Sequence, residues 1–120
     1  IRVSLFIAAD ERQLEAAARL GAAVVELHTG PYAHAFDHGD AEAELARLAH
    51  AAEVGAGLGL EIHAGHGLTY ANVGPVAALP QLAELNIGHF LVGEAVFVGL
   101  DAAIHRMRAL MDRARAGTGP

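Results

Sequence analysis

The chain has 120 residues, of which 53% are hydrophobic, and its formal net charge at pH 7 is −6. That length suits one domain with a buried core, and an acidic chain without a basic run argues against a nucleic-acid partner. Because cysteine is absent, disulfides and thiolate metal sites are excluded, which fits a reducing compartment. The apolar stretches fall short of the roughly 20 residues that a membrane span needs, so we expect no membrane partner.

The first part of the chain predicts a strand, a helix and a second strand. Residues 3–7 are β-branched and aromatic, as strands commonly are. Asp10 follows as a helix N-cap candidate, with Gln13 in capping-box register, and we expect this helix to close at Gly21. Residues 22–27 contain a continuous apolar run, which is typical of a strand buried on both faces in a parallel sheet.

The middle of the chain continues the alternation. Residues 31–39 are expected to form a loop, and residues 40–57 carry the clearest helical pattern of the chain. Residues 60–64 are predicted to be the third strand. A short helix is expected over residues 72–79, with Asn72 as its N-cap, and a short fourth strand over residues 85–87.

The last part of the chain is less regular. Residues 90–99 fit a strand or a helix equally well by periodicity. Asp101 is expected to cap a final amphipathic helix that runs to Arg115, and residues 117–120 are expected to be a tail. Since the chain begins without Met on a predicted strand, we also expect an upstream segment.

This order of elements indicates an α/β fold with a parallel sheet. Strands that alternate with helices usually lie side by side and run in the same direction, joined by right-handed crossovers. Two architectures fit the pattern. One is an open doubly wound sheet, and the other is half of a (β/α)8 barrel, because a whole barrel typically needs about 250 residues.

Polar side chains are concentrated where the predicted strands end. They are Asp10 after the first strand, Glu26 and His28 at the second, His63 and His66 at the third, and Asn86 and His89 at the fourth. The carboxyl ends of parallel strands share one rim, so we expect these groups to converge. Each alone could be a solvated loop residue. Together they indicate function, because acidic and imidazole groups in apolar strands are costly unless they are partnered.

Glu26 and His66 are the leading catalytic candidates. Alternation places Glu26 on the same strand face as His28, and a carboxylate that faces a barrel interior suits acid/base chemistry. The structural alternative for Glu26 is a buried Glu–Arg ion pair. His66 stands between two glycines at a strand mouth, where an imidazole can donate or accept a proton near neutral pH. Its alternative is a loop imidazole bonded to the backbone.

Gly88 and His89 are candidates for a phosphate site. If residues 90–98 form a helix, the free N–H groups at its start can bind phosphate; if they form a core strand, this site is lost. A metal site is a further alternative, with candidate ligands Glu26, His28, His63, His66 and His89. The His63-x-x-His66 spacing lies at a strand-to-loop junction and is a weak signal for a metal, so we expect none.

Several motifs together resemble a known family. They are VSLFI at residues 3–7, ELHTG at 26–30 with YA at 32–33, AGHGLTY at 64–70 with NV at 72–73, and ELNIGH at 84–89. In this order and spacing they resemble the carboxyl-terminal half of pyridoxine 5′-phosphate synthase, a vitamin B6 pathway enzyme. The resemblance covers nearly the whole chain.

The resemblance implies that residues 1–120 are the carboxyl-terminal half of a single (β/α)8 barrel domain, strands five to eight. It implies condensation of 1-deoxy-D-xylulose 5-phosphate with 3-amino-2-oxopropyl phosphate to pyridoxine 5′-phosphate, phosphate and water. The expected partners are therefore small phosphorylated substrates. No metal or organic cofactor is implied, and the family is cytoplasmic and assembles as a homo-octamer.

By the same resemblance, His66 matches the family's proton donor and Gly67 a neighbouring ligand contact. Glu26 matches a carboxylate that stabilises transition states, and Gly88 and His89 match a contact to substrate phosphate. The family's other bases lie on the first half of the barrel, so the isolated chain is expected to be inactive.

Two residues depart from the family pattern. Ala8 stands where Asp is expected, which removes any role for that carboxylate, and His63 stands where Asn is commoner, which could alter hydrogen bonding around His66. Two other functions stay open from the sequence. The chain could be a non-catalytic half-barrel that only folds and self-associates, or part of another phosphate-binding barrel enzyme.

Overall fold

The computed structural model describes residues 1–117, and the rest of the expected tail lies outside them. The strands are β1 (Ser4–Ile7), β2 (Val24–His28), β3 (Glu61–Gly65) and β4 (Leu82–Asn86). The helices are α1 (Glu11–Arg19), α2 (Gly30–Asp37), α3 (Glu42–Gly57), α4 (Val73–Ala77), α5 (His89–Val98) and α6 (Leu100–Ala116). Among the described residues, no helix is both long and apolar enough to cross a membrane.

The strands form one parallel sheet in the order β1-β2-β3-β4. The predicted α/β fold with a parallel sheet is therefore confirmed. A doubly wound sheet changes direction at a switch point in its strand order, whereas these strands follow one another in chain order. That order is consistent with half of a (β/α)8 barrel.

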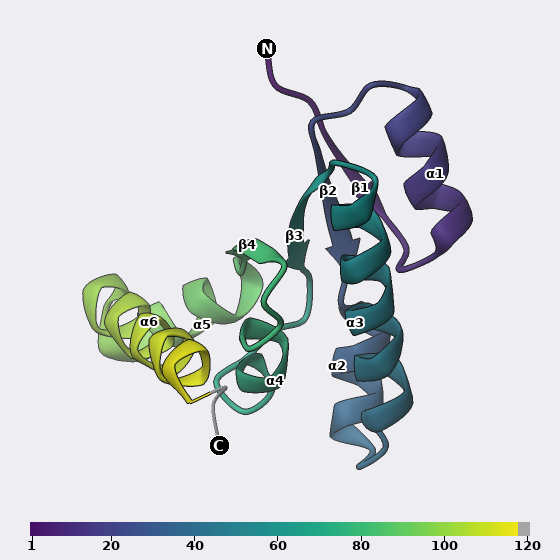
Figure 1. Ribbon diagram of the computed structural model, residues 1–120. Coiled ribbons are helices and arrows are strands. Elements are labelled where there is room, and N and C mark those ends of the chain that lie inside the picture. Colours follow the sequence, from purple (N-terminus) through teal and green to yellow (C-terminus); the bar gives the residue numbers. More distant parts are fainter. Residues whose placement is uncertain (118–120) are drawn as a thin grey trace.

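The two faces of the sheet have different chemistry. On one face Val25, Leu27, Ile62 and Ala64 are almost fully buried, and they belong to a core shared with α1, α3 and α4. Figure 1 shows α1 and α3 lying along this side of the sheet. The opposite face carries Glu26, His28, His63 and Asn86 from adjacent strands, and Phe6 there is 56% exposed. The polar residues of the candidate site therefore project from the face opposite the helical core.

The prediction of a loop over residues 31–39 is wrong, because α2 begins at Gly30. Pro31 lies in the first turn of α2, where its missing N–H costs nothing and its fixed φ favours the helix. Tyr32 and Ala33 on this helix are buried. Tertiary packing therefore stabilises a segment whose Gly, Pro and Asp residues read as turn signals.

Two other elements, β4 and α6, also differ from the prediction, and α5 settles an alternative that the sequence left open. β4 begins at Leu82, three residues before the predicted start. Its pairing with β3 is irregular there, because Ile62 pairs with Leu82 whereas His63 pairs with Glu84. This shift breaks the alternation of side chains from which a strand is predicted. The ambiguous stretch 90–99 is helical. The final helix begins at Leu100, so Asp101 lies in its first turn and is not its N-cap as predicted.

The start of α1 follows the prediction in part. Asp10 is its N-cap, and the side-chain oxygen accepts a hydrogen bond from the Arg12 N–H at 2.9 Å. The predicted reciprocal bond from Gln13 does not form as a capping box, because Gln13 Oε1 accepts from the Ala8 N–H at 2.9 Å.

Candidate active site

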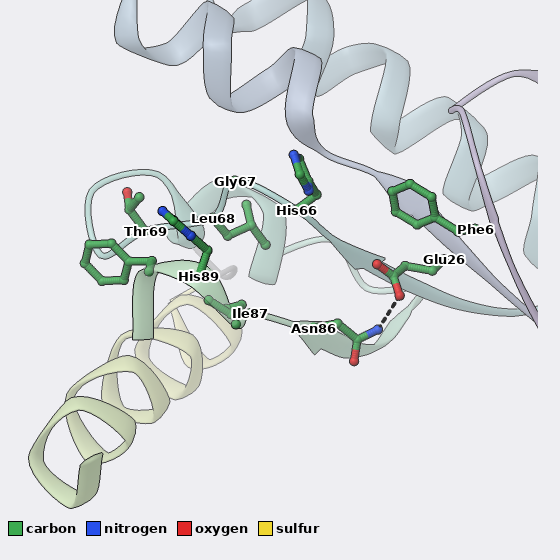
Figure 2. A pocket seen from close by; sticks show the side chains of 11 residues that line it. Phe6, Glu26, His66, Gly67, Leu68, Thr69, Asn86, Ile87 and His89 are labelled. Atoms are coloured by element: carbon green, nitrogen blue, oxygen red, sulfur yellow. Dashed lines mark hydrogen bonds between the residues drawn. The ribbon is translucent and has the colours of Figure 1, made fainter. Parts of the chain in front are cut away.

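A cavity of about 390 Å³ lies at the carboxyl-terminal rim of the sheet. Its lining residues are Phe6, Glu26, His66, Gly67, Leu68, Thr69, Asn86, Ile87, Gly88, His89 and Phe90. They come from β1, β2 and β4, from the loop after β3, and from the segment that leads from β4 into α5 (Figure 2). All five residues predicted as site residues, Glu26, His66, Gly67, Gly88 and His89, line this one cavity. Its volume falls in the range of small-molecule sites.

Glu26 is held in place by the two following strands. Its Oε1 accepts a hydrogen bond from Asn86 Nδ2 at 2.7 Å (Figure 2). On β3 between them, a Cβ at Gly65 would lie 2.6 Å from Glu26 Oε2, so only glycine leaves room for the carboxylate. The side-chain partner of Glu26 is an amide and not the arginine of the alternative interpretation.

His66 has an unusual backbone. With φ of +87°, it is the only non-glycine residue among 1–117 in the left-handed region. Such a conformation costs about 1–3 kcal/mol and persists only where the surroundings enforce it. The buried Thr29 hydroxyl donates to the His66 carbonyl at 2.6 Å, and the Thr29 N–H donates to the Gly65 carbonyl at 2.8 Å. The end of β2 therefore fixes the loop after β3.

Asn72 holds the other side of this loop. The residue is the N-cap of α4, as predicted, but its side chain bonds the preceding loop and not the helix. Its Oδ1 accepts from the Thr69 N–H at 2.8 Å, and its Nδ2 donates to the Gly67 carbonyl at 3.2 Å. Tyr32 donates its hydroxyl to the Asn72 carbonyl at 2.6 Å, and burial raises the pKa of this tyrosine. Sequence reasoning missed this clamp.

The start of α5 forms the far wall of the cavity. Gly88 is its N-cap and His89 its first residue, and both are exposed. A Cβ at Gly88 would meet nothing within 4 Å, so a ligand can approach the backbone there. The first N–H groups of a helix have no intrahelical partner, and the helix dipole favours an anion beside them. This geometry suits a phosphate group.

Three of the polar residues expected at the rim do not line the cavity. Asp10 caps α1, and His28 contacts the ring of His66 from the side. His63 is buried within β3 and contacts two carboxylates, Glu61 at 2.5 Å from Nε2 and Glu84 at 3.2 Å from Nδ1. Its expected place at the rim is therefore wrong, because Ala64 and Gly65 extend the strand beyond it.

Arg2 places a positive charge beside Glu61, one of the two carboxylates that His63 contacts. Arg2 pairs with Glu61 at 2.8 Å, and the hydrogen bonds from Arg2 and His63 lower the pKa of the Glu61 carboxyl. His63 thus bonds side chains of its own strand and of β4, and not the loop of His66. Within residues 1–117, no group of three or more His, Asp or Glu side chains is placed to hold a metal ion.

The apolar part of the lining was also missed. These residues are Phe6, Leu68, Ile87 and Phe90. They come from three separate parts of the chain, and each looks like a core residue in its local context. Phe90 packs edge-on against Tyr70 at 4.7 Å between ring centroids. This contact ties the end of the AGHGLTY motif to α5.

Comparisons with known proteins show which family the chain belongs to. The family model described as "Pyridoxal phosphate biosynthesis protein PdxJ" matches residues 1–113. The pyridoxine 5′-phosphate synthase of Jannaschia sp. is 63% identical over 118 residues, covering 96% of this chain and 48% of that protein. The synthases of Roseobacter denitrificans and Xanthobacter autotrophicus are each 62% identical, over 96% and 99% of this chain and 47% and 48% of theirs.

The chain spans about half the length of the curated relatives that it matches. The family model nevertheless covers nearly all of the chain, and it includes every segment that lines the cavity. The chain belongs to the PdxJ family of pyridoxal phosphate biosynthesis proteins.

Proposed function

We propose that this chain supplies strands five to eight of the (β/α)8 barrel of a pyridoxine 5′-phosphate synthase. The reaction condenses 1-deoxy-D-xylulose 5-phosphate with 3-amino-2-oxopropyl phosphate to pyridoxine 5′-phosphate, phosphate and water. The observation that carries the proposal is the single cavity that joins Glu26, His66 and the start of α5 in a chain of this family.

The proposed chemistry needs proton transfer at several steps. Imine formation and the following dehydrations require protons delivered to leaving oxygens and removed from carbon. We assign His66 as the proton donor, because its loop conformation presents the imidazole at the cavity. Glu26 stabilises positive charge that develops on the reacting nitrogen and carbon, and Asn86 holds its carboxylate in a fixed orientation.

The phosphate of a substrate is proposed to bind between Gly67 and the start of α5. Gly67 has φ of +85°, and a Cβ there would lie 2.8 Å from Ala33 Cβ, so the backbone at this position is close-packed on α2. Gly88 and His89 contribute backbone N–H groups and an imidazole. Binding a phosphate remote from the reacting atoms supplies energy that orients those atoms.

The assembly and location of the protein are part of the same proposal. We place it in the cytoplasm as a homo-octamer that uses no metal or organic cofactor. Exposed apolar side chains on α5, among them Val92 at 64%, Val96 at 78% and Phe97 at 85%, support burial against further protein. Light scattering on the full-length protein tests the octamer, and a monomer would contradict it.

An assay of product formation tests the proposed reaction. The full-length protein is incubated with both substrates, and pyridoxine 5′-phosphate is measured by chromatography with fluorescence detection. Glu26→Gln should lower kcat by about 100-fold, because the neutral amide no longer balances positive charge. The control His105→Gln alters an exposed residue of α6 and should leave kcat unchanged. Absence of the product with the unmodified protein would refute the proposal.

A further inference from the structure

The ring of His28 lies against the ring of His66. Their centroids are 4.9 Å apart and the ring planes cross at 71°, which is an edge-to-face contact. On its other side, His28 packs against Phe6 at 5.0 Å between centroids. The His28 imidazole is therefore placed between an apolar ring of β1 and the proposed proton donor.

Thr29 and Gly30, which follow His28, also contact or make room for His66. The Thr29 hydroxyl binds the His66 carbonyl. At Gly30, a Cβ would collide with His28 Nε2 and would lie 3.1 Å from His66 Cδ2. Glycine at this position leaves the space that the two imidazoles occupy. Three consecutive residues at the end of β2 thus hold the backbone of His66, contact its ring, and clear room for that contact.

We propose that His28 is a positioning residue that orients the His66 imidazole and, by staying neutral, leaves the proton of the pair on His66. The proposal rests on the proposed function, which makes His66 the proton donor. An edge-to-face pair of rings is geometrically selective, so it limits rotation of the His66 side chain. Two positively charged imidazoles at this distance would repel each other, so the pair favours a single charge.

Burial and the charges around His28 together favour its neutral form. Burial lowers the pKa of His28, and the charge on His66 lowers it further, while the nearby Glu26 carboxylate raises it by a smaller amount. Phe6 on β1 and Gly30 on α2 add no charge. His28 therefore loses its proton at a lower pH than an unperturbed histidine does.

Nuclear magnetic resonance tests the coupling without any assay of turnover. The histidine ring signals of the full-length protein are followed against pH, with and without the substitution His66→Gln. The midpoint of His28 should rise in the variant, because the neighbouring charge that lowers it is gone. An unchanged midpoint would overturn the proposal.

Kinetics of His28→Ala and His28→Phe test the positioning. The alanine variant should lose about tenfold in kcat with little change in KM, because the His66 ring is no longer held in line with the substrate. Its pH–rate profile should also shift, which loss of packing alone would not cause. The phenylalanine variant keeps an uncharged ring against His66 and should recover most of kcat.

Equal losses in the two variants, or a loss confined to KM with an unchanged pH profile, would overturn the role of His28. Thermal unfolding of each variant confirms that it is folded before it is assayed. If His28→Ala does not fold, His28→Phe and the titration still decide the question. Failure of the proposed function is distinguishable, because the unmodified protein would then make no pyridoxine 5′-phosphate while the His28 titration still responded to His66→Gln.

Discussion

Asn72 gives a direct test of how the loop that carries His66 is held. The residue is 1% exposed, and its side chain bonds both the Thr69 N–H and the Gly67 carbonyl. Each such bond contributes about 1 kcal/mol net to stability, because folding exchanges bonds to water for bonds within the protein. Asn72→Ala removes both bonds, so we expect the free energy of unfolding to fall by about 2 kcal/mol.

Urea unfolding of the full-length protein measures this change. Gln81→Ala, which removes a partly exposed amide just before β4, is the matched control and should change the unfolding free energy by less than about 0.5 kcal/mol. Asn72→Ala should also lower kcat, because the loop between Gly67 and Thr69 loses its anchor. If Asn72→Ala unfolds with the same free energy as the unmodified protein, the two hydrogen bonds of the Asn72 side chain do not stabilise the fold.

Three further predictions concern stability and pH. Gly67→Ala should destabilise the protein by about 1–2 kcal/mol through its positive φ alone, and by more because the added Cβ would contact Ala33. Adding Ala33→Gly in a double-mutant cycle should remove only the destabilisation that comes from the contact. Full recovery of stability would contradict the backbone argument. His63→Asn should lower the free energy of urea unfolding by up to about 1 kcal/mol at neutral pH, because the carboxylates it contacts are partly exposed; a more stable variant would contradict this. The pKa of His28 is lowered from 6.5 by burial and by His66, so the folded protein binds fewer protons there than the unfolded chain. The stability that comes from the neutral His28 is present above pH 6.5 and is lost as the pH falls. His28→Phe should therefore gain stability relative to the unmodified protein as the pH falls from about 7.5 to about 5.5. An unchanged difference across that range would refute the assignment.

The parallel sheet and the rim were predictable because their signals are local. The second strand is a continuous apolar run that ends in Glu26 and His28, and both its burial and its polar end are visible in the sequence. The same holds for the third strand and His66. Because parallel strands share a rim, this topology predicts that Glu26 and His66 lie close together, and both line the cavity.

The parts that sequence reasoning missed depend on tertiary contacts. α2 contains Gly30 and Pro31, which favour turns locally, and it is stabilised by burial of Tyr32. The role of Asn72 needs the Thr69 and Gly67 backbone groups to lie within reach of its amide. A sequence predicts that Asn can cap a helix, but it does not show which of several nearby backbone groups the amide will bind.

The position of His63 shows a related limit. A histidine close to the end of a strand suggested the rim, and the structure places it inside β3 between carboxylates of its own strand and of β4. A shift of a few residues along a strand moves a side chain from rim to interior, and element boundaries are the least certain part of a sequence prediction.

The most direct test of the central claim is the kcat of His66→Asn in the full-length protein, measured as formation of pyridoxine 5′-phosphate. Asn tolerates the left-handed backbone at this position, so the substitution removes the imidazole and leaves the loop conformation in place. The proposed role of His66 as proton donor predicts a loss of about 100-fold or more. A variant with the kcat of the unmodified protein would contradict it.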